Sequence, residues 1–186
     1  MRVFLKQCRP AILCLLMLTL LCGVVYTGLI TGLGQLLFPR QANGSIIAVT
    51  LPAGARNEYG SALIAQSFTE PQYLIGRPLT VSNLSPTSGE QAKLVRQRVD
   101  WWHSLDPGNT APIPADLVTG SGSGVDPHIS PQAAEYQVAR IAKARQMPEE
   151  EVRKIIKKHT QGRLLGFIGE PTVNVLQVNL ALDGLI

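Results

Sequence analysis

The residues best suited to chemistry lie in one short stretch, residues 116 to 131. Three glycines alternate there with Ser121 and Ser123, and Asp126 and His128 follow directly. Alternating glycines allow a loop to bend tightly, while serine hydroxyls and free backbone amides supply hydrogen bonds that suit a phosphate group. Serine, histidine and aspartate are also the residue types of a hydrolase triad. The stretch therefore raises two kinds of chemistry, phosphate binding and acyl transfer.

The spacing of these residues does not match the motifs that carry such chemistry. No lysine followed by Ser or Thr closes the glycine run, as a P-loop requires, and Pro127 stands where the last glycine of GxGxxG belongs. The serines do not fit a GxSxG elbow, and residues so close along one loop rarely converge as a triad. Asp126 and His128 are two metal ligands without a third. The sequence therefore predicts no catalytic residue and no metal site.

A structural role explains the same side chains more simply. Asp126 before Pro127 can close a turn through its carboxylate, and His128 can hydrogen-bond loop backbone. Ser130 precedes a proline, so its hydroxyl can cap a helix that begins at Pro131. We predict a loop whose polar side chains satisfy its own amides.

A long uncharged stretch near the N-terminus must position the rest of the chain. Residues 10 to 39, between Arg9 and Arg40, carry no charged side chain. As a helix, residues 11 to 37 would be roughly 40 Å long, against a hydrocarbon layer of about 30 Å. A cleaved signal peptide would have a shorter apolar region and a small-x-small site. We predict a single transmembrane helix over residues 10 to 39.

Charge around this helix predicts its orientation. Three cations precede the span and one follows it, which favours a cytoplasmic N-terminus. Beyond Arg40, the remaining 13 Lys and Arg residues balance the 13 Asp and Glu residues, so the basic pI reflects topology and not nucleic-acid binding. We therefore predict a cytoplasmic tail over residues 1 to 9 and a single extracytoplasmic soluble domain over residues 40 to 186.

One face of the span is unlike that of an inert anchor. Gly28 and Gly32 form a GxxxG step, and Gln35 lies one turn further along the same side. Small residues let a second helix approach closely, and a glutamine in hydrocarbon needs a hydrogen-bond partner. We predict that Gly28, Gly32 and Gln35 pack against a helix of a membrane-embedded partner. The alternative is that glycine is common in membrane helices and that Gln35 is wetted at the interface.

The remaining chain contains signals for both helices and strands. Periodicity and capping residues predict a strand, three helices and a second strand, in the order 46–51, 88–104, 131–145, 148–161 and 173–182. No cysteine lies in this part, so disulfides do not stabilise it. The expected fold class is an α+β soluble domain, with strands from both of its ends, anchored by one N-terminal transmembrane helix.

Several short blocks of residues stand in one order after the N-terminal span and cover nearly the whole chain. They are Gln41-Ala-Asn-Gly-Ser45, Gly60-Ser-Ala-Leu-Ile-Ala-Gln66, Arg77-Pro78, Asp116-Leu-Val-Thr119, Ser121-Gly-Ser-Gly124, Asp126-Pro-His-Ile-Ser-Pro131 and Gly169-Glu-Pro171 with Val173-Asn-Val-Leu176. In this order the blocks resemble one protein family, the C subunit of the Kdp potassium-transporting ATPase.

The resemblance implies a single-pass accessory subunit in a bacterial inner membrane. Its partners would be a potassium-channel-like subunit, a P-type ATPase subunit and a small fourth subunit, and the complex would handle ATP and potassium ion. This chain carries no aspartyl-phosphate signature and so would not be the catalytic subunit. The family is held to be needed for assembly, and is assigned as a catalytic chaperone that raises the ATP affinity of the ATPase subunit.

The sequence departs from the family where a nucleotide contact has been placed. The family carries a longer loop with a Ser-Gly-Gly run between Arg77-Pro78 and the Ser-Asn-Leu that here begins at Ser82, whereas this chain has only residues 79 to 81. Because the domain is also expected outside the cytoplasm, we predict no specific ATP binding by it. The loop residues that remain as candidate contacts are Ser82, Asn83, Ser121, Ser123, Asp126 and His128.

Two other functions fit parts of the sequence. A membrane-anchored extracytoplasmic ligand-binding module would act without partner subunits. A serine hydrolase would depend on Ser121 or Ser123. Neither alternative explains why the ordered blocks of residues occur together in this chain, whereas the family resemblance does.

Overall fold

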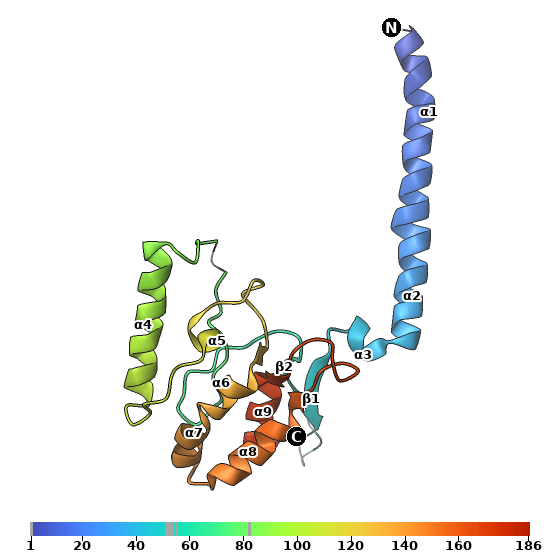
Figure 1. Cartoon of the computed structure of the whole chain (residues 1–186). Coiled ribbons are helices and arrows are strands. Elements are labelled where there is room, and N and C mark those ends of the chain that lie inside the picture. Colours follow the sequence, from blue (N-terminus) through green and yellow to red (C-terminus); the bar gives the residue numbers. More distant parts are fainter. Residues whose placement is uncertain (1, 51–53, 55, 82) are drawn as a thin grey trace. The chain divides into compact units, whose positions relative to one another are not determined.

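The structure is a computed structural model that describes residues 2 to 50, 54, 56 to 81 and 83 to 186. The chain divides into two compact units, Met1–Ile46 and Ile47–Ile186. The first is helical and the second mixes helices with short strands (Figure 1).

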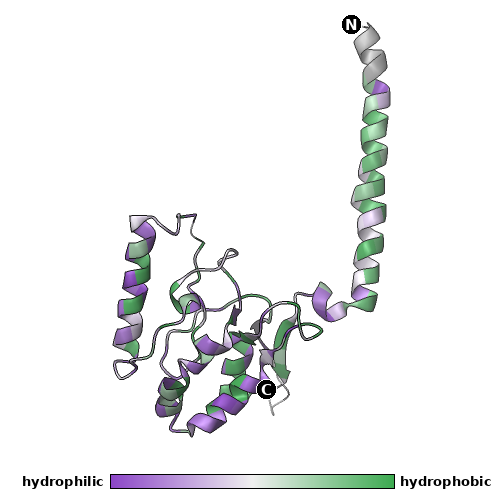
Figure 2. Cartoon of the chain, viewed as in Figure 1, coloured by the Kyte–Doolittle hydropathy of each residue, from purple (hydrophilic) through white to green (hydrophobic). Residues whose placement is uncertain are grey.

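The first unit is a nearly continuous helix. It comprises α1 (Arg2–Thr19), a π-helical segment η1 (Leu20–Tyr26) and α2 (Thr27–Leu37), followed by the single turn α3 (Pro39–Ala42). Directly after η1, the Thr27 hydroxyl donates to the Cys22 carbonyl at 2.9 Å. Among the described residues, Cys8–Leu37 is the one helix long and apolar enough to cross a membrane, and Figure 2 colours it mostly as hydrophobic along that length.

The polar end of this helix finds its partners within the first unit. Gln35 and Asn43 exchange side-chain hydrogen bonds of 2.9 and 3.3 Å, and Asn43 also donates to the Pro39 carbonyl at 2.6 Å. The amide of Gln35 is therefore satisfied by a residue eight positions along the chain. The predicted packing of Gly28, Gly32 and Gln35 against a second helix stays a prediction.

The second unit contains two small sheets and six helices among the described residues, and the strands of the three-stranded sheet are antiparallel. Strands β1 and β2 pair with each other, and a separate three-stranded sheet has the order β3-β5-β4. Its helices and strands are β1 (Ile46–Thr50), β2 (Arg56–Ser61), α4 (Gly89–Leu105), α5 (Ala115–Val118), β3 (His128–Ile129), α6 (Pro131–Glu135), α7 (Val138–Arg145), α8 (Glu149–Lys158), β4 (Thr160–Gln161), β5 (Thr172–Asn174) and α9 (Val175–Leu182). The expected mixture of helix and sheet is confirmed, but the two ends of the domain do not share one sheet.

Helix starts are the best-predicted features of this unit. The Ser88 hydroxyl accepts from the Gln91 amide at 3.1 Å and begins α4, and the Ser130 hydroxyl accepts from the Ala133 amide at 3.0 Å and begins α6. The helix expected over 131–145 is divided into α6 and α7 near Gln137, whose side chain forms hydrogen bonds with the backbone of Ile75. The helix expected from 148 ends earlier, at Lys158 in α8.

The strand expected over residues 173 to 182 is wrong. Only Thr172–Asn174 pairs as β5, and the chain then turns into α9. The Asn174 side chain accepts from the Gln177 amide at 3.1 Å, which caps the helix. The residues from 175 to 180 are nearly all buried, so this short apolar run has no clear period.

A segment without regular structure, residues 71 to 75, is held in the core by side chains. The side-chain oxygen of Asn179 accepts a hydrogen bond from the Leu74 amide at 2.7 Å, and its side-chain nitrogen donates to the Leu74 carbonyl at 2.9 Å. Gln137 does the same for Ile75, at 2.8 and 2.9 Å. Both side chains are almost completely buried, so they supply the hydrogen bonds that a neighbouring strand would otherwise give.

Arg140 adds further hydrogen bonds to the segment of residues 71 to 75. Its guanidinium donates to the carbonyls of Pro71 and Tyr73 and to the side chain of Gln137, and it lies 5.8 Å from the centre of the Trp102 ring. Burial lowers the pKa of Arg140 to about 10, which still leaves it charged at neutral pH. Helix α7 is thereby fixed against residues 71 to 75.

Candidate functional site

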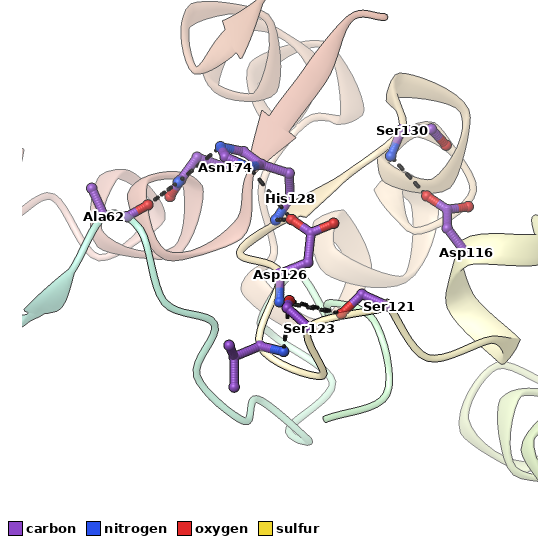
Figure 3. Close-up of polar contacts among 9 residues, drawn as sticks. Ala62, Asp116, Ser121, Ser123, Asp126, His128, Ser130 and Asn174 are labelled. Carbon is purple, nitrogen blue, oxygen red and sulfur yellow. Dashed lines mark hydrogen bonds and ion pairs between the residues drawn. The ribbon is translucent and has the colours of Figure 1, made fainter. Parts of the chain in front are cut away.

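Both serines of the Gly-Ser loop, residues 120 to 125, bond to the loop itself (Figure 3). The Ser123 hydroxyl accepts from the Val125 amide at 3.2 Å, and the Ser121 hydroxyl accepts from the Asp126 amide at 3.4 Å. The two hydroxyl oxygens lie 3.3 Å apart. The predicted self-satisfying loop is confirmed for these side chains.

Asp126 and His128 face each other at the end of this loop. The Asp126 carboxylate accepts from the His128 amide at 3.0 Å, which is the predicted side-chain turn, and its Oδ1 lies 3.5 Å from His128 Nδ1. The imidazole contacts side chains and not the loop backbone: its Nε2 lies 3.4 Å from Asn174 Nδ2, which also donates to the Ala62 carbonyl at 2.9 Å. Strand pairing places Asn174 directly opposite His128 (Figure 3).

Asp116 joins the start of the motif to its end. One of its carboxylate oxygens accepts from the Ser130 amide at 2.7 Å, while the Ser130 hydroxyl caps α6. The residues from 116 to 130 therefore form a closed polar loop, fixed at both ends.

The short segment 79 to 81 packs directly on the Gly-Ser loop. A Cβ atom at Gly120 would lie 2.6 Å from the Thr80 carbonyl oxygen, and one at Gly124 would lie 2.5 Å from a Val81 methyl group. Arg77 adds a hydrogen bond of 3.2 Å to the Gly120 carbonyl. The glycines are thus required by a close approach of two segments, in addition to the bending that the sequence predicted.

Replacing Gly124 with alanine is expected to destabilise the second unit by about 1–3 kcal/mol, because the site combines a close contact with a left-handed backbone. Its φ is +72°, whereas at Gly122 a Cβ would meet no atom within 4 Å. Gly122→Ala is the matched control, with an expected change near zero. Urea unfolding of the full chain in detergent measures both, and equal effects of the two substitutions would contradict this account of the loop.

An open cleft of about 460 Å³ brings several of the predicted residues together. Asp116, Asp126 and His128 line it, with Arg77 and Glu170 added from other segments. Its lining carries three carboxylates and one guanidinium. Such a cleft disfavours a triphosphate, since like charges repel it.

The remaining candidate residues lie elsewhere. Ser121 and Ser123 do not line the cleft, Asn83 is exposed outside it, and Ser82 lies outside the described residues. In the described structure the Ser121 hydroxyl bonds to Ser123 and to the Asp126 amide, so Ser121 and His128 are not placed as a nucleophile and its base. No group of three or more His, Cys, Asp or Glu side chains in the described chain is placed to hold a metal ion.

Arg77, Glu170 and Asn174 were not identified from the sequence as neighbours of this motif. Asn174 meets His128 only because β3 and β5 pair across 46 positions. No local pattern in the sequence signals such a contact, whereas the Asp126 turn and the Ser130 cap depend on residues two and three positions away.

These features define a class of protein: one candidate membrane-spanning helix followed by a small mixed unit whose polar motif serves its own loop. The chain belongs to the family described as K+-transporting ATPase, c chain (KdpC), whose model matches residues 8–184. The resemblance inferred from the ordered blocks is confirmed.

Several relatives named potassium-transporting ATPase KdpC subunit align with essentially the whole chain. The chain is 55% identical over 188 residues to the potassium-transporting ATPase KdpC subunit of Listeria monocytogenes, covering 100% of this chain and 99% of the relative. The subunits of Methylococcus capsulatus and Sorangium cellulosum are 49% and 47% identical, over 95% and 97% of this chain and 97% and 98% of theirs. The chain is therefore an accessory subunit of a Kdp potassium-transporting ATPase complex.

Proposed function

We propose that this subunit is non-catalytic and stabilises the assembled pump from the outer face of the membrane, without contacting ATP. The observation that carries the proposal is the closed loop of residues 116 to 130. Its serine hydroxyls and its Asp116 and Asp126 carboxylates accept hydrogen bonds from amides of the same loop. Groups used in this way are not arranged as a nucleophile, its base or a phosphate cradle.

The charge pattern supports the outward location. Arg2, Lys6 and Arg9 lie at the N-terminal end of the helix that could span the membrane and only Arg40 follows its other end closely, while residues 41 to 186 carry 13 basic and 13 acidic residues. Cellular ATP is cytoplasmic, so a domain outside the membrane would not meet it. The partners in this proposal are a potassium-channel-like subunit, a P-type ATPase subunit and a small fourth subunit.

The family's assigned role as a catalytic chaperone is the competing function. In that role the domain would contact nucleotide and raise the ATP affinity of the ATPase subunit. The segment of residues 79 to 81 is packed against Gly120 and Gly124, where the family's longer loop would offer free glycines. The acidic lining of the neighbouring cleft also opposes a triphosphate.

Binding of ATP to the purified full-length chain distinguishes these functions. We expect no saturable binding at ATP concentrations up to about 1 mM, the upper end of common substrate affinities. Equilibrium dialysis with radiolabelled ATP measures this, with the intact pump as the positive control. Saturable binding that is lost in Arg77→Glu, which removes the guanidinium of the cleft, and not in Arg96→Glu on the exposed surface of α4, would instead support the chaperone role.

A further inference from the structure

The hairpin of residues 163 to 170, between β4 and β5, exposes large apolar side chains to solvent. Leu165 and Phe167 are 76% and 73% exposed, and Leu164 and Ile168 are exposed beside them. Figure 1 draws the hairpin as a red loop that projects from the second unit. Outside the membrane-spanning helix, Leu165 and Phe167 are the most exposed of the large apolar residues that the structure describes. A cluster of this kind marks an interaction surface.

The hairpin has a defined shape. Leu164 and Ile168 exchange backbone hydrogen bonds of 2.9 and 3.0 Å, and Phe167 donates to the Leu164 carbonyl at 3.3 Å. Leu165 has a φ of +54°, which is rare for a leucine and costs conformational energy. A strained, well-connected backbone that holds apolar side chains away from the core indicates that their exposed position is functional.

The charges at the base of the hairpin favour a protein surface over a lipid surface. Arg163 and Glu170 form an ion pair of 2.9 Å, and residues 164 to 169 carry no charge. Membrane-binding loops gain from unpaired cations near anionic headgroups, whereas here the cation is paired and the exposed Glu170 would be repelled. A fixed shape with an apolar tip and a charged base matches the core and rim of a protein interface.

We propose that the hairpin of residues 163 to 170 attaches this subunit to another subunit of the ATPase, with Leu165 and Phe167 inserted in an apolar cleft of that partner. The inference rests on the proposed assembly role and deepens it. Burial of the two side chains on docking supplies the binding energy, and the Arg163 and Glu170 pair lies at the rim.

Photo-crosslinking in the intact pump tests the contact directly. The full complex is expressed with p-benzoyl-phenylalanine in place of Phe167, and in a control preparation in place of Tyr26 within the membrane span. We expect irradiation of the Phe167 position to give a covalent product with one of the large subunits, identified by peptide mass. A product with phospholipid alone, or none, would overturn the proposal.

A pair of substitutions provides a second measurement. Leu165→Asn with Phe167→Ser should lower recovery of this subunit with the complex by about tenfold, as expected when two interface anchors are removed. Asparagine tolerates the positive φ at Leu165, and circular dichroism checks the fold. Leu63→Asn with Ile64→Ser, at two other exposed apolar residues, is the matched control.

The outcomes separate the docking proposal from the assembly role. If the unmodified chain does not co-purify with the pump subunits, the proposed function itself fails. If it co-purifies and the hairpin pair is recovered as well as the unmodified chain, or if both pairs lose recovery equally, the hairpin is not the docking element.

Discussion

Replacing Asn179 with leucine is expected to lower the free energy of unfolding of the second unit by about 3 kcal/mol, because a buried amide and carbonyl would each lose their partner. Asn179 supplies both hydrogen bonds to the Leu74 backbone, at 2.7 and 2.9 Å, and it is 1% exposed. Leucine has a similar volume, so the lost hydrogen bonds dominate over any cavity. The effect should be among the largest of any single substitution here.

Urea unfolding of the full chain in detergent measures this effect. Both tryptophans of the chain, Trp101 and Trp102, lie in the second unit, so their fluorescence reports its unfolding alone. Gln132→Leu is the matched control, since Gln132 is exposed. A loss below about 1 kcal/mol for Asn179→Leu would mean that water or a shifted backbone replaces the side chain.

Replacing Gly28 and Gly32 together with leucine is expected to reduce recovery of the chain with the other pump subunits by about tenfold or more. Apart from the neighbouring residues and the backbone of the helix itself, a Cβ atom at either glycine meets nothing within 4 Å. The substitutions therefore leave this chain's own helix undisturbed, and a loss of assembly would report a partner helix that needs close approach.

Gly34→Leu is the control for the helix face. Gly34 also has open space around its Cβ position, but at 3.6 residues per turn it lies about 120° away from Gly28 around the helix axis. Recovery of the complex should be unchanged in that variant. Equal recovery of the double variant and the unmodified chain would show that the GxxxG step has no packing partner.

The sequence predicted features that depend on a few neighbouring residues. The Ser130 cap, the Asp126 turn and the long apolar helix all follow from residues within one or two helical turns. The mixture of helix and sheet was therefore predictable in outline, and so was the structural character of the Gly-Ser loop.

Features that depend on distant contacts were not predictable in this way. The run from Val175 to Leu180 becomes a helix because Asn174 caps it and both of its sides are buried, so the alternation that indicated a strand was incidental. The lining of the acidic cleft likewise depends on Glu170 and Arg77, which lie far from the motif in sequence. Buried Asn179 and Gln137 look like ordinary polar residues until the backbone they bind is known.

The proposed ATP-free role requires the second unit to lie outside the cytoplasm, and the accessibility of a single cysteine measures on which side of the membrane it lies. All three natural cysteines, Cys8, Cys14 and Cys22, belong to the first unit, so a cysteine-free chain with Ser104→Cys carries one exposed probe in the second unit. A membrane-impermeant maleimide should label it in intact spheroplasts, with a cytoplasmic cysteine introduced in the ATPase subunit as the unlabelled control. Labelling of Ser104→Cys only after lysis would place the second unit in the cytoplasm and contradict the proposed outward, ATP-free role.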